Sequence, residues 1–271
     1  MDTEIAIRGS FFFGVFAFIG LWELLAPRRA LTTSKPVRWF GNLAIILLNT
    51  VVVPCAFPIL PVALAVLAEK NGWGLLNLFH PPYWMAVVVG VIVLDLVIYF
   101  QHVLFHAVPA LWRLHMVHHA DLDFDVTTGL RFHPIEIILS TAIKLAAVVV
   151  FGPPALAVLV FEVLLNATSM FNHGNIRIPL AFDGLLRLFV VTPEMHRVHH
   201  SVVIKETNSN FGFNLPWWDR LFGTYRDQPA AGHQGMTIGL SQFRVPQRLS
   251  LPWLLALPFV GDPGRQPINR H

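Results

Sequence analysis

The stretch "AVVVFGPPALAVLV", residues 147–160, sets a glycine and two prolines between two apolar runs. Proline lacks the amide N–H that a helix interior needs, so residues 151–154 are expected to end one helix and begin the next. The apolar sequence continues in both directions and fills residues 135–172, which gives each arm the length of a membrane span. We therefore predict an antiparallel helical hairpin embedded in a membrane.

Three further apolar runs, residues 10–26, 40–68 and 83–105, precede this hairpin. Of the 271 residues, 55% are hydrophobic and 13% are charged, whereas a soluble domain carries about 25% charged residues. Too little polar sequence is left to cover the core of a soluble α/β protein. The chain is expected to be an all-α integral membrane helical bundle of about four to five spans, including the hairpin.

Basic residues crowd the loop between the first two predicted spans, whereas Lys70 is the single lysine or arginine of the loop at 69–82. The positive-inside rule then places the first loop in the cytoplasm, and the spans alternate down to a cytoplasmic C-terminus. We expect a multi-pass protein of a bacterial inner membrane. The formal charge of +3 arises largely from this loop and does not indicate a nucleic-acid partner. The basic residues of the loop are Arg28, Arg29, Lys35 and Arg38.

Ten of the thirteen histidines fall at the cytoplasmic ends of the predicted spans or in cytoplasmic segments. They include "HVLFH" at 102–106, "HMVHH" at 115–119 and "HRVHH" at 196–200. Residues i, i+3 and i+4 share a helix face, so H-x-x-H-H offers two nitrogens to one metal ion and a third to a neighbour. This pattern predicts a cytoplasmic, histidine-rich helical cap that binds metal. The predicted ligands are His102, His106, His115, His118, His119, His133, His173, His196, His199 and His200, and the set leaves out His80, His233 and His271.

The hairpin supplies a check on this placement. His133 lies twenty residues before Pro153 and His173 lies twenty after it, so two antiparallel helices would bring both imidazoles to one depth. Lys144 and Glu162 lie nine residues before and nine after the same proline. Because an isolated charge is unfavourable in hydrocarbon, we expect these two side chains to pair.

Three other polar residues are candidates for supporting the ligands. Asp95 lies seven residues before His102, on the same helix face. At the helical rise per residue it is about 10 Å from His102, too far to ligate the same ion. It could orient a ligand through Tyr99 or a water, and a purely structural role stays open. Asn172, beside His173, is the third candidate.

The number and kind of ligands bear on the metal. Ten imidazoles are too many for one ion and suit two. Zinc is the usual partner of histidine in soluble hydrolases, but iron also takes imidazole. Iron can activate dioxygen, which attack on an unactivated lipid C–H bond requires. Iron therefore stays a candidate for both ions beside zinc, which could replace it in preparations.

Several of these motifs occur in one order that is typical of a known family. They are "HVLFH", "LWRLHMVHH", "GLRFHPIE", "FNHGN", "VTPEMHRVHHS" and "NFGFNLPWWDRLFGTY", between residues 85 and 227. The chain resembles the fatty acid hydroxylase superfamily, which includes sterol desaturases, sterol methyl oxidases and fatty acid or sphingolipid hydroxylases. Fatty acid 2-hydroxylases carry a further H-x-x-x-H before the last motif, where this chain has only His173, and this favours the sterol-desaturase-like branch.

The resemblance implies a non-haem di-iron centre, with no catalytic side chain beyond it. The implied ligands are the eight histidines of the three motifs, completed by His133 and His173. The implied organisation is one membrane-embedded domain, with N-terminal spans at 1–82, a catalytic region at 83–228 and a C-terminal tail at 229–271. The implied reaction is O₂-dependent hydroxylation or desaturation of a sterol, fatty acyl or sphingolipid-like C–H bond. Since the chain has no dinucleotide or flavin fingerprint, an external donor is expected, a ferredoxin or a cytochrome with its reductase.

Two other functions are weighed against this one. A histidine-rich membrane metal-binding or transport protein would place ligands near mid-membrane along a path, whereas these gather at one face. A zinc-dependent membrane hydrolase would want a general-base glutamate within a ligand motif. Glu194 lies close to His196, but no H-E-x-x-H is present. The sequence leaves open the lipid, the carbon oxidised, the redox partner and the oligomeric state.

Two later segments are expected to be structural. Residues 210–225 contain no good ligand, and their aromatic side chains suit packing against the cap or the membrane interface. Residues 183–191 are apolar with one arginine, and both an interfacial helix and a core helix stay open for them.

Overall fold

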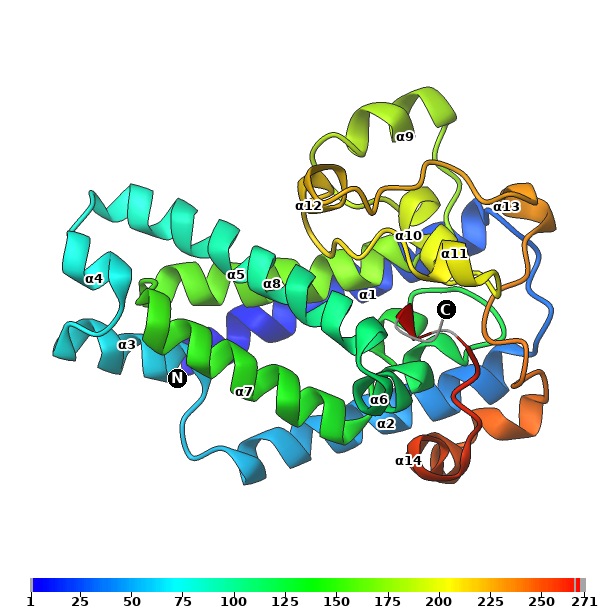
Figure 1. The fold of residues 1–271 in the computed structure, drawn as a ribbon, viewed down its shortest axis with the longest axis horizontal. Coiled ribbons are helices and arrows are strands. Elements are labelled where there is room, and N and C mark those ends of the chain that lie inside the picture. Colours follow the sequence, from blue (N-terminus) through cyan, green and yellow to red (C-terminus); the bar gives the residue numbers. More distant parts are fainter. Residues whose placement is uncertain (1, 266, 269–271) are drawn as a thin grey trace.

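Long apolar helices run along the molecule, and most of the shorter helices gather at one end of them (Figure 1). The structure is a computed structural model that describes residues 2–265, 267 and 268. Within these residues it contains helices, loops and two isolated β-bridges but no strand, which confirms the predicted all-α fold. Five segments are long and apolar enough to span a membrane. The long helices are α1 (Asp2–Leu25), α2 (Lys35–Ala56), α5 (Tyr83–Ala107), α7 (Pro134–Phe151) and α8 (Ala155–Asn172).

Helices α7 and α8 form the predicted hairpin. After α7 ends at Phe151, Gly152 caps it in the left-handed conformation with φ 62°, which glycine adopts without strain. A Cβ at this position would lie 2.4 Å from the Trp73 carbonyl oxygen, so a side chain does not fit. Within the hairpin, Lys144 Nζ lies 2.9 Å from Glu162 Oε1, as their spacing predicts.

The second predicted span, residues 40–68, is broken in the structure. Helix α2 ends at Ala56, and two short helices, α3 (Pro61–Asn71) and α4 (Leu75–Phe79), follow at the far end of the bundle (Figure 1). Pro58 and Pro61 lack amide hydrogens and disfavour helical backbone before them. The chain therefore leaves the helix at Phe57, just before Pro58, and becomes helical again only at Pro61, so we assign this crossing to α2 alone.

The bundle is held together by apolar faces of its long helices. Helix α1 packs along α8, α2 packs along α7, and α5 packs against both arms of the hairpin. Leu94 and Ile98 of α5 meet Val148 of α7 and Phe161 of α8 in one buried cluster. Other faces expose large apolar side chains such as Phe13, which suits contact with lipid.

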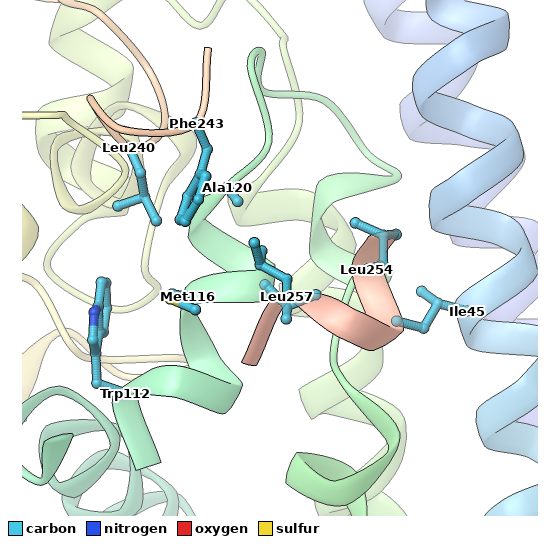
Figure 2. Packing of buried hydrophobic residues seen from close by; sticks show 9 residues of the cluster. Ile45, Trp112, Met116, Ala120, Leu240, Phe243, Leu254 and Leu257 are labelled. Carbon is cyan, nitrogen blue, oxygen red and sulfur yellow. The ribbon is translucent and has the colours of Figure 1, made fainter. Parts of the chain in front are cut away.

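A cap of short helices covers one end of the bundle. Helix α14 packs on α6, where Leu254 and Leu257 lie in one cluster with Trp112 and Met116, joined by Ile45 of α2 (Figure 2). The C-terminal tail thus covers the outer side of α6. The helices of the cap are α6 (Pro109–His119), η1 (Thr128–Leu130), α9 (Leu180–Leu186), α10 (Pro193–His199), α11 (Ile204–Thr207), α12 (Trp217–Leu221), α13 (Gly232–Gly235), η2 (Pro246–Leu249) and α14 (Leu251–Val260).

Buried charges tie the loop after α6 to α2. Arg38 Nε donates to Asp121 Oδ1 at 2.7 Å, and the same guanidinium donates to Asp125. Arg131 Nη1 lies 3.7 Å from the same oxygen, Asp121 Oδ1. The sequence counts Arg38 among the basic residues of a cytoplasmic loop, but the structure shows it in α2, buried and paired. These ion pairs fix where the histidine-bearing α6 lies against the bundle.

Candidate metal centre

Nine buried histidines meet where the bundle joins the cap. Their ligand atoms form two groups, and within each group these atoms lie within 4.8 Å of one another. We call the first the five-histidine group and the second the four-histidine group. The five-histidine group consists of His102, His106, His115, His119 and His199. The four-histidine group consists of His118, His173, His196 and His200.

Helix periodicity explains this division. In α6, His115 and His119 are one turn apart and enter the five-histidine group, while His118 points to the other group. The second motif, in and after α10, divides the opposite way, with His199 alone in the five-histidine group. Two histidines of each H-x-x-H-H motif thus belong to one group, and the third belongs to the other group. The arrangement is the one expected from the motif, and binding of metal by it stays a prediction.

Hydrogen bonds on the far side of the rings set the direction of the ligand nitrogens. The Nδ1–H groups of His102, His173 and His199 donate to carbonyl oxygens at 2.7–2.8 Å. A carbonyl oxygen only accepts, so the proton lies on Nδ1 and the Nε2 lone pair points into the group. The acceptors belong to Phe211, Ser169 and Ser209, respectively.

The ligand nitrogens themselves lie close together. His102 Nε2 is 3.1 Å from His115 Nε2, and His173 Nε2 is 3.1 Å from the Nε2 atoms of His118 and His200. Where the Nδ1 atoms carry the protons, as in His102 and His173, a lone pair faces its neighbour, and facing lone pairs repel. A cation between the two nitrogens removes this repulsion, because both lone pairs then bind the cation. Imidazole nitrogens suit iron, zinc, copper and nickel, so these residues fit two transition-metal ions.

Burial keeps these imidazoles in the neutral form that a metal requires. It lowers the pKa of His115 and of His173 to about 3. Burial, followed by the neighbouring histidines, also lowers the pKa of the other cap ligands well below the usual range. These ligands are His118, His119, His196, His199 and His200.

His133 lies outside both groups, so the geometry gives no support to its predicted role as a ligand. Helix α7 begins at Pro134, so His133 becomes its N-cap, and its Nδ1 accepts from the Ile135 N–H at 3.2 Å. Its Nε2 is 3.3 Å from the Leu255 carbonyl oxygen of α14. Both ring nitrogens are occupied by these contacts, and the ring connects the start of α7 to α14 of the C-terminal tail.

The three supporting candidates, Asp95, Tyr99 and Asn172, contact the segment 210–225 rather than the histidines. Asp95 accepts from two backbone N–H groups of the segment and from Trp218 Nε1 at 2.8 Å. The Tyr99 hydroxyl and the Asn172 side-chain amide bond to the same segment at 2.9 and 3.1 Å. Their contact with the site is indirect. They hold the segment whose Phe211 carbonyl oxygen accepts the hydrogen bond from His102 Nδ1–H.

Sequence reasoning missed the residues that touch the rings directly. Glu136 Oε1 is 2.6 Å from His115 Nδ1, and Asn208 Oδ1 is 3.1 Å from His106 Nδ1. A signal for Glu136 was present, since a buried carboxylate in an apolar span needs a partner. The remaining partners are backbone carbonyls, which carry no residue-type signal.

A cavity of about 840 Å³ leads from the membrane face of the bundle to the five-histidine group. Its lining comes mainly from α1, α2, α5, α7 and α8, and it is largely apolar, with Phe12 and Leu43 among the side chains. At its inner end it reaches His102 and His115. The space suits one lipid chain brought up to a metal site.

Together the fold and the site define a multi-span helical membrane protein with two buried histidine groups beside an apolar cavity. Residues 87–224 match the family model described as fatty acid hydroxylase, and the chain belongs to this family. The resemblance inferred from the motifs is thereby confirmed.

Three curated relatives show what the chain is similar to. It is 31% identical to ornithine lipid hydroxylase OlsE of Rhizobium tropici, over 79% of this chain and 65% of the relative. It is 28% identical to human alkylglycerol monooxygenase, over 63% of this chain and 38% of the relative. The chain thus spans less than two thirds of these two proteins. It is 25% identical to the very-long-chain aldehyde decarbonylase GL1-8 of rice (Oryza sativa subsp. indica), over 83% of this chain and 87% of the relative. No solved structure matches the chain significantly.

Proposed function

We propose that this chain is an O₂-dependent oxidoreductase that hydroxylates a lipid, and that its two histidine groups hold two iron ions. The observation that carries the proposal is the meeting of two buried imidazole groups with the inner end of an apolar cavity. The cavity, about 840 Å³, is of the size that holds one small ligand or one lipid chain. Relatives named as an ornithine lipid hydroxylase and an alkylglycerol monooxygenase support hydroxylation of a lipid over desaturation.

Iron is the proposed metal because zinc has no redox chemistry. When bound, iron supplies the activation of dioxygen that oxidation of a C–H bond requires. Burial in the chain holds the imidazoles neutral, and backbone carbonyls keep the protons of His102, His173 and His199 on Nδ1, which leaves their Nε2 lone pairs free to bind. The apolar cavity walls keep water away from the carbon to be oxidised.

The remaining parts of the proposal concern location and partners. All nine clustered histidines lie between residues 83 and 228, so we propose this region as the catalytic one, after N-terminal spans and before a C-terminal tail. We place the site on the cytoplasmic side of a bacterial inner membrane, where a ferredoxin or a cytochrome with its reductase can deliver electrons. The basic loop at residues 28–35 supports this orientation.

The two competing functions gain no support from the geometry. The ligand groups lie at one end of the bundle rather than along a path through it. Glu194, the one glutamate close to the last motif, is bound to Arg197 at 2.9 Å and lies 3.0 Å from His233. It is therefore engaged within the cap and is not aimed at a metal as a general base.

The test compares lipid extracts of cells expressing the wild type or His118→Ala under ¹⁸O₂. We expect a lipid that carries one ¹⁸O atom in the wild-type extract alone. A wild-type product that lacks two hydrogens and carries no label would replace hydroxylation by desaturation. Identical extracts from cells that also express a ferredoxin and its reductase, with iron bound by the wild type, would contradict the oxygenase proposal.

A further inference from the structure

Two ligands of the five-histidine group are held by one short stretch of backbone. The Ser209 carbonyl oxygen accepts from His199 Nδ1–H at 2.7 Å, and the Phe211 carbonyl oxygen accepts from His102 Nδ1–H at 2.8 Å. The centroids of these two imidazole rings are 4.6 Å apart. Residues 209–211 therefore determine the direction of two Nε2 lone pairs that would bind the same ion.

The four-histidine group does not depend on this stretch. His173 Nδ1–H donates to the Ser169 carbonyl oxygen, within the last turn of α8. The other three histidines of the group bond to His173 through Nε2, and their Nδ1 atoms have no hydrogen-bond partner among the described residues. A change confined to residues 209–212 should thus reach one group and leave the other.

Asn210 lies between the two carbonyl-bearing residues and has an unusual backbone conformation. Its φ is 54°, in the left-handed region that asparagine tolerates better than most residues. Its buried side chain is fully bound, since Nδ2 donates to the Met195 and Arg226 carbonyl oxygens at 2.8 Å each, and Oδ1 accepts from the Arg226 N–H at 2.8 Å. Met195 belongs to α10, the helix that carries His199. Asn210 therefore turns the chain and anchors it to that helix.

The buried carboxylate of Asp219 holds the other end of the stretch. Oδ1 accepts from the Phe211 N–H at 2.7 Å, and Oδ2 accepts from the Gly212 N–H at 2.8 Å. The Gly212 N–H and the Phe211 carbonyl belong to one planar peptide group. Asp219 at one edge of this plane and His102 at the other edge thus fix its orientation. Glycine is required here, because a Cβ would lie 2.7 Å from Asp219 Oδ2.

We propose that Asn210 and Asp219 are positioning residues of the metal centre. They fix residues 209–212 so that two carbonyl oxygens hold His102 and His199 in the orientation that binds an ion. They thereby set the metal affinity of the five-histidine group and not that of the four-histidine group. This inference rests on the proposed binding of two metal ions, but it does not depend on the reaction that the ions support.

The test measures metal binding by the full chain in detergent, without O₂ or reductant. Co²⁺ is the probe, because nitrogen ligands bind it and its visible absorption reports the ligands around it. Metal-free protein is titrated in two backgrounds, His118→Ala and His119→Ala, which change neighbouring residues of α6 that belong to different groups. The first background leaves the five-histidine group complete, and the second leaves the four-histidine group complete.

The first variant to combine with both backgrounds is Asn210→Gly, since glycine adopts a positive φ and only the side chain is lost. In His118→Ala we expect it to weaken Co²⁺ binding by at least about tenfold, as is usual when a residue that orients a ligand is lost. In His119→Ala we expect a change of less than about threefold, because the remaining group has other supports. Asp219→Asn should act in the same way, because its amide N–H₂ then faces a backbone N–H.

Asn175→Gly is the matched control. Asn175 is buried, and its side chain pairs with the N–H and the carbonyl oxygen of Arg29 at 3.0 and 2.9 Å. Asn210 pairs with the same two backbone groups of Arg226. The control therefore loses similar hydrogen bonds without a contact to residues 209–212. We expect the Co²⁺ affinity of the five-histidine group to stay within about threefold of its value without this change.

Three results would overturn the proposal. They are a loss of affinity in both backgrounds, a loss in neither, and a loss in Asn175→Gly equal to that in Asn210→Gly. A folded His118→Ala chain that binds no Co²⁺ would also contradict it, because the five-histidine group would then not hold an ion by itself. If Asn210→Gly does not fold, Asp219→Asn decides between these outcomes.

The inference and the proposed hydroxylase can fail separately. Selective loss of Co²⁺ affinity in the His118→Ala background, with no ¹⁸O incorporation by the wild type under turnover conditions, would support the positioning role and contradict the hydroxylase. Incorporation of ¹⁸O by the wild type, with unchanged Co²⁺ binding in both Asn210→Gly and Asp219→Asn, would support the hydroxylase and contradict the positioning role.

Discussion

At the scale of single residues, the site depends on what each imidazole does with its second nitrogen. Carbonyl oxygens of Phe211, Ser169 and Ser209 hold protons on three Nδ1 atoms and so direct three Nε2 lone pairs inward. Glu136 supports the site as well, since its Oε1 lies 2.6 Å from His115 Nδ1. His133 resembles these residues in sequence but differs in position, because both of its nitrogens face backbone groups.

His118 and His133 therefore respond differently to removal. We expect His118→Ala to lower bound iron by at least about half, because it removes one of the four nitrogens of its group. His133→Ala keeps its metal, since its ring meets α7 and α14 and no other histidine of the site. Metal per purified chain is measured by mass spectrometry.

The control is His80→Asn. His80 is exposed and has a φ of 48°, a conformation that asparagine tolerates. His233 is a poorer control than its place in the sequence indicates, because it is buried 3.0 Å from Glu194. Full metal content in His118→Ala would remove it from the site. A loss in His133→Ala equal to that in His118→Ala would restore the ten-histidine set.

At the scale of elements, the cap is joined to the bundle in two ways. Apolar packing joins α14 to α6, and buried ion pairs join the loop after α6 to α2. Helix α9 is different, because its Leu180, Phe182 and Leu185 are exposed while Asp183 is buried and pairs with Arg187. Of the two interpretations left open for residues 183–191, this exposure favours a helix at the membrane interface over a core helix.

The Asp121 carboxylate is the centre of the buried ion pairs that connect the loop after α6 to α2. Burial acts to raise the pKa of Asp121, but the guanidinium groups of Arg38 and Arg131 outweigh it and hold that pKa well below its usual range. Asp121→Asn leaves two buried arginines with less counter-charge. We expect it to lower the free energy of unfolding by about 3 kcal/mol, the low end for a broken buried pair because Asp125 still binds Arg38.

The measurement is thermal unfolding in detergent, with Glu69→Gln as the exposed control. The effect also depends on pH. A depressed carboxyl pKa stabilises the folded state above the unfolded pKa of about 4, and this contribution declines as the pH falls below it. The difference in the free energy of unfolding between the wild type and Asp121→Asn should therefore become smaller as the pH falls below about 4. A gap that is absent at neutral pH, or widens in acid, would contradict this account of the joint.

At the scale of the whole molecule, local sequence patterns predicted the features that depend only on helix geometry and on the residues that end helices. The hairpin at 151–154, the pairing of Lys144 with Glu162 and the division of each H-x-x-H-H follow from helical periodicity and from proline and glycine chemistry. The break after α2 had a signal in Pro58 and Pro61, but the apolar run concealed it. Periodicity could not show the hydrogen-bond partners of the imidazole rings. His102, for example, bonds to the backbone oxygen of Phe211, which is 109 residues away.

Contacts of that kind depend on how the cap folds over the bundle. The tail illustrates this, since Trp112 Nε1 donates to the Pro263 carbonyl across 151 residues. The partners of the three supporting candidates were missed for the same reason. Asp95 and Tyr99 lie in α5 and Asn172 ends α8, but their partners lie in residues 210–225, which a spacing argument does not locate.

The orientation of the whole molecule in its membrane is the remaining expectation, and it has a direct test. Five crossings by α1, α2, α5, α7 and α8 put the cap and the start of α1 on opposite sides. The loop between α1 and α2, with Arg28 and Arg29, contacts the cap at Glu194 and Met236, and Lys35 begins α2 next to it. Lys70 belongs to α3, which lies at the other end of the bundle (Figure 1). Arg38 contributes little to this balance because it is buried in an ion pair. By the positive-inside rule, this asymmetry is the reason for the proposal that the cap lies in the cytoplasm.

Single-cysteine labelling reads this orientation. Cys55 is the only cysteine and is changed to alanine, after which either Lys70→Cys or Ser241→Cys, both at exposed positions, introduces one reporter. In bacterial cells whose outer membrane has been permeabilised, a membrane-impermeant maleimide should label position 70 at once and position 241 only after the inner membrane is opened. The reverse pattern would place the histidine groups on the outer face of the membrane. A cytoplasmic electron donor could then not reach them, and the proposed source of electrons would have to change along with the topology.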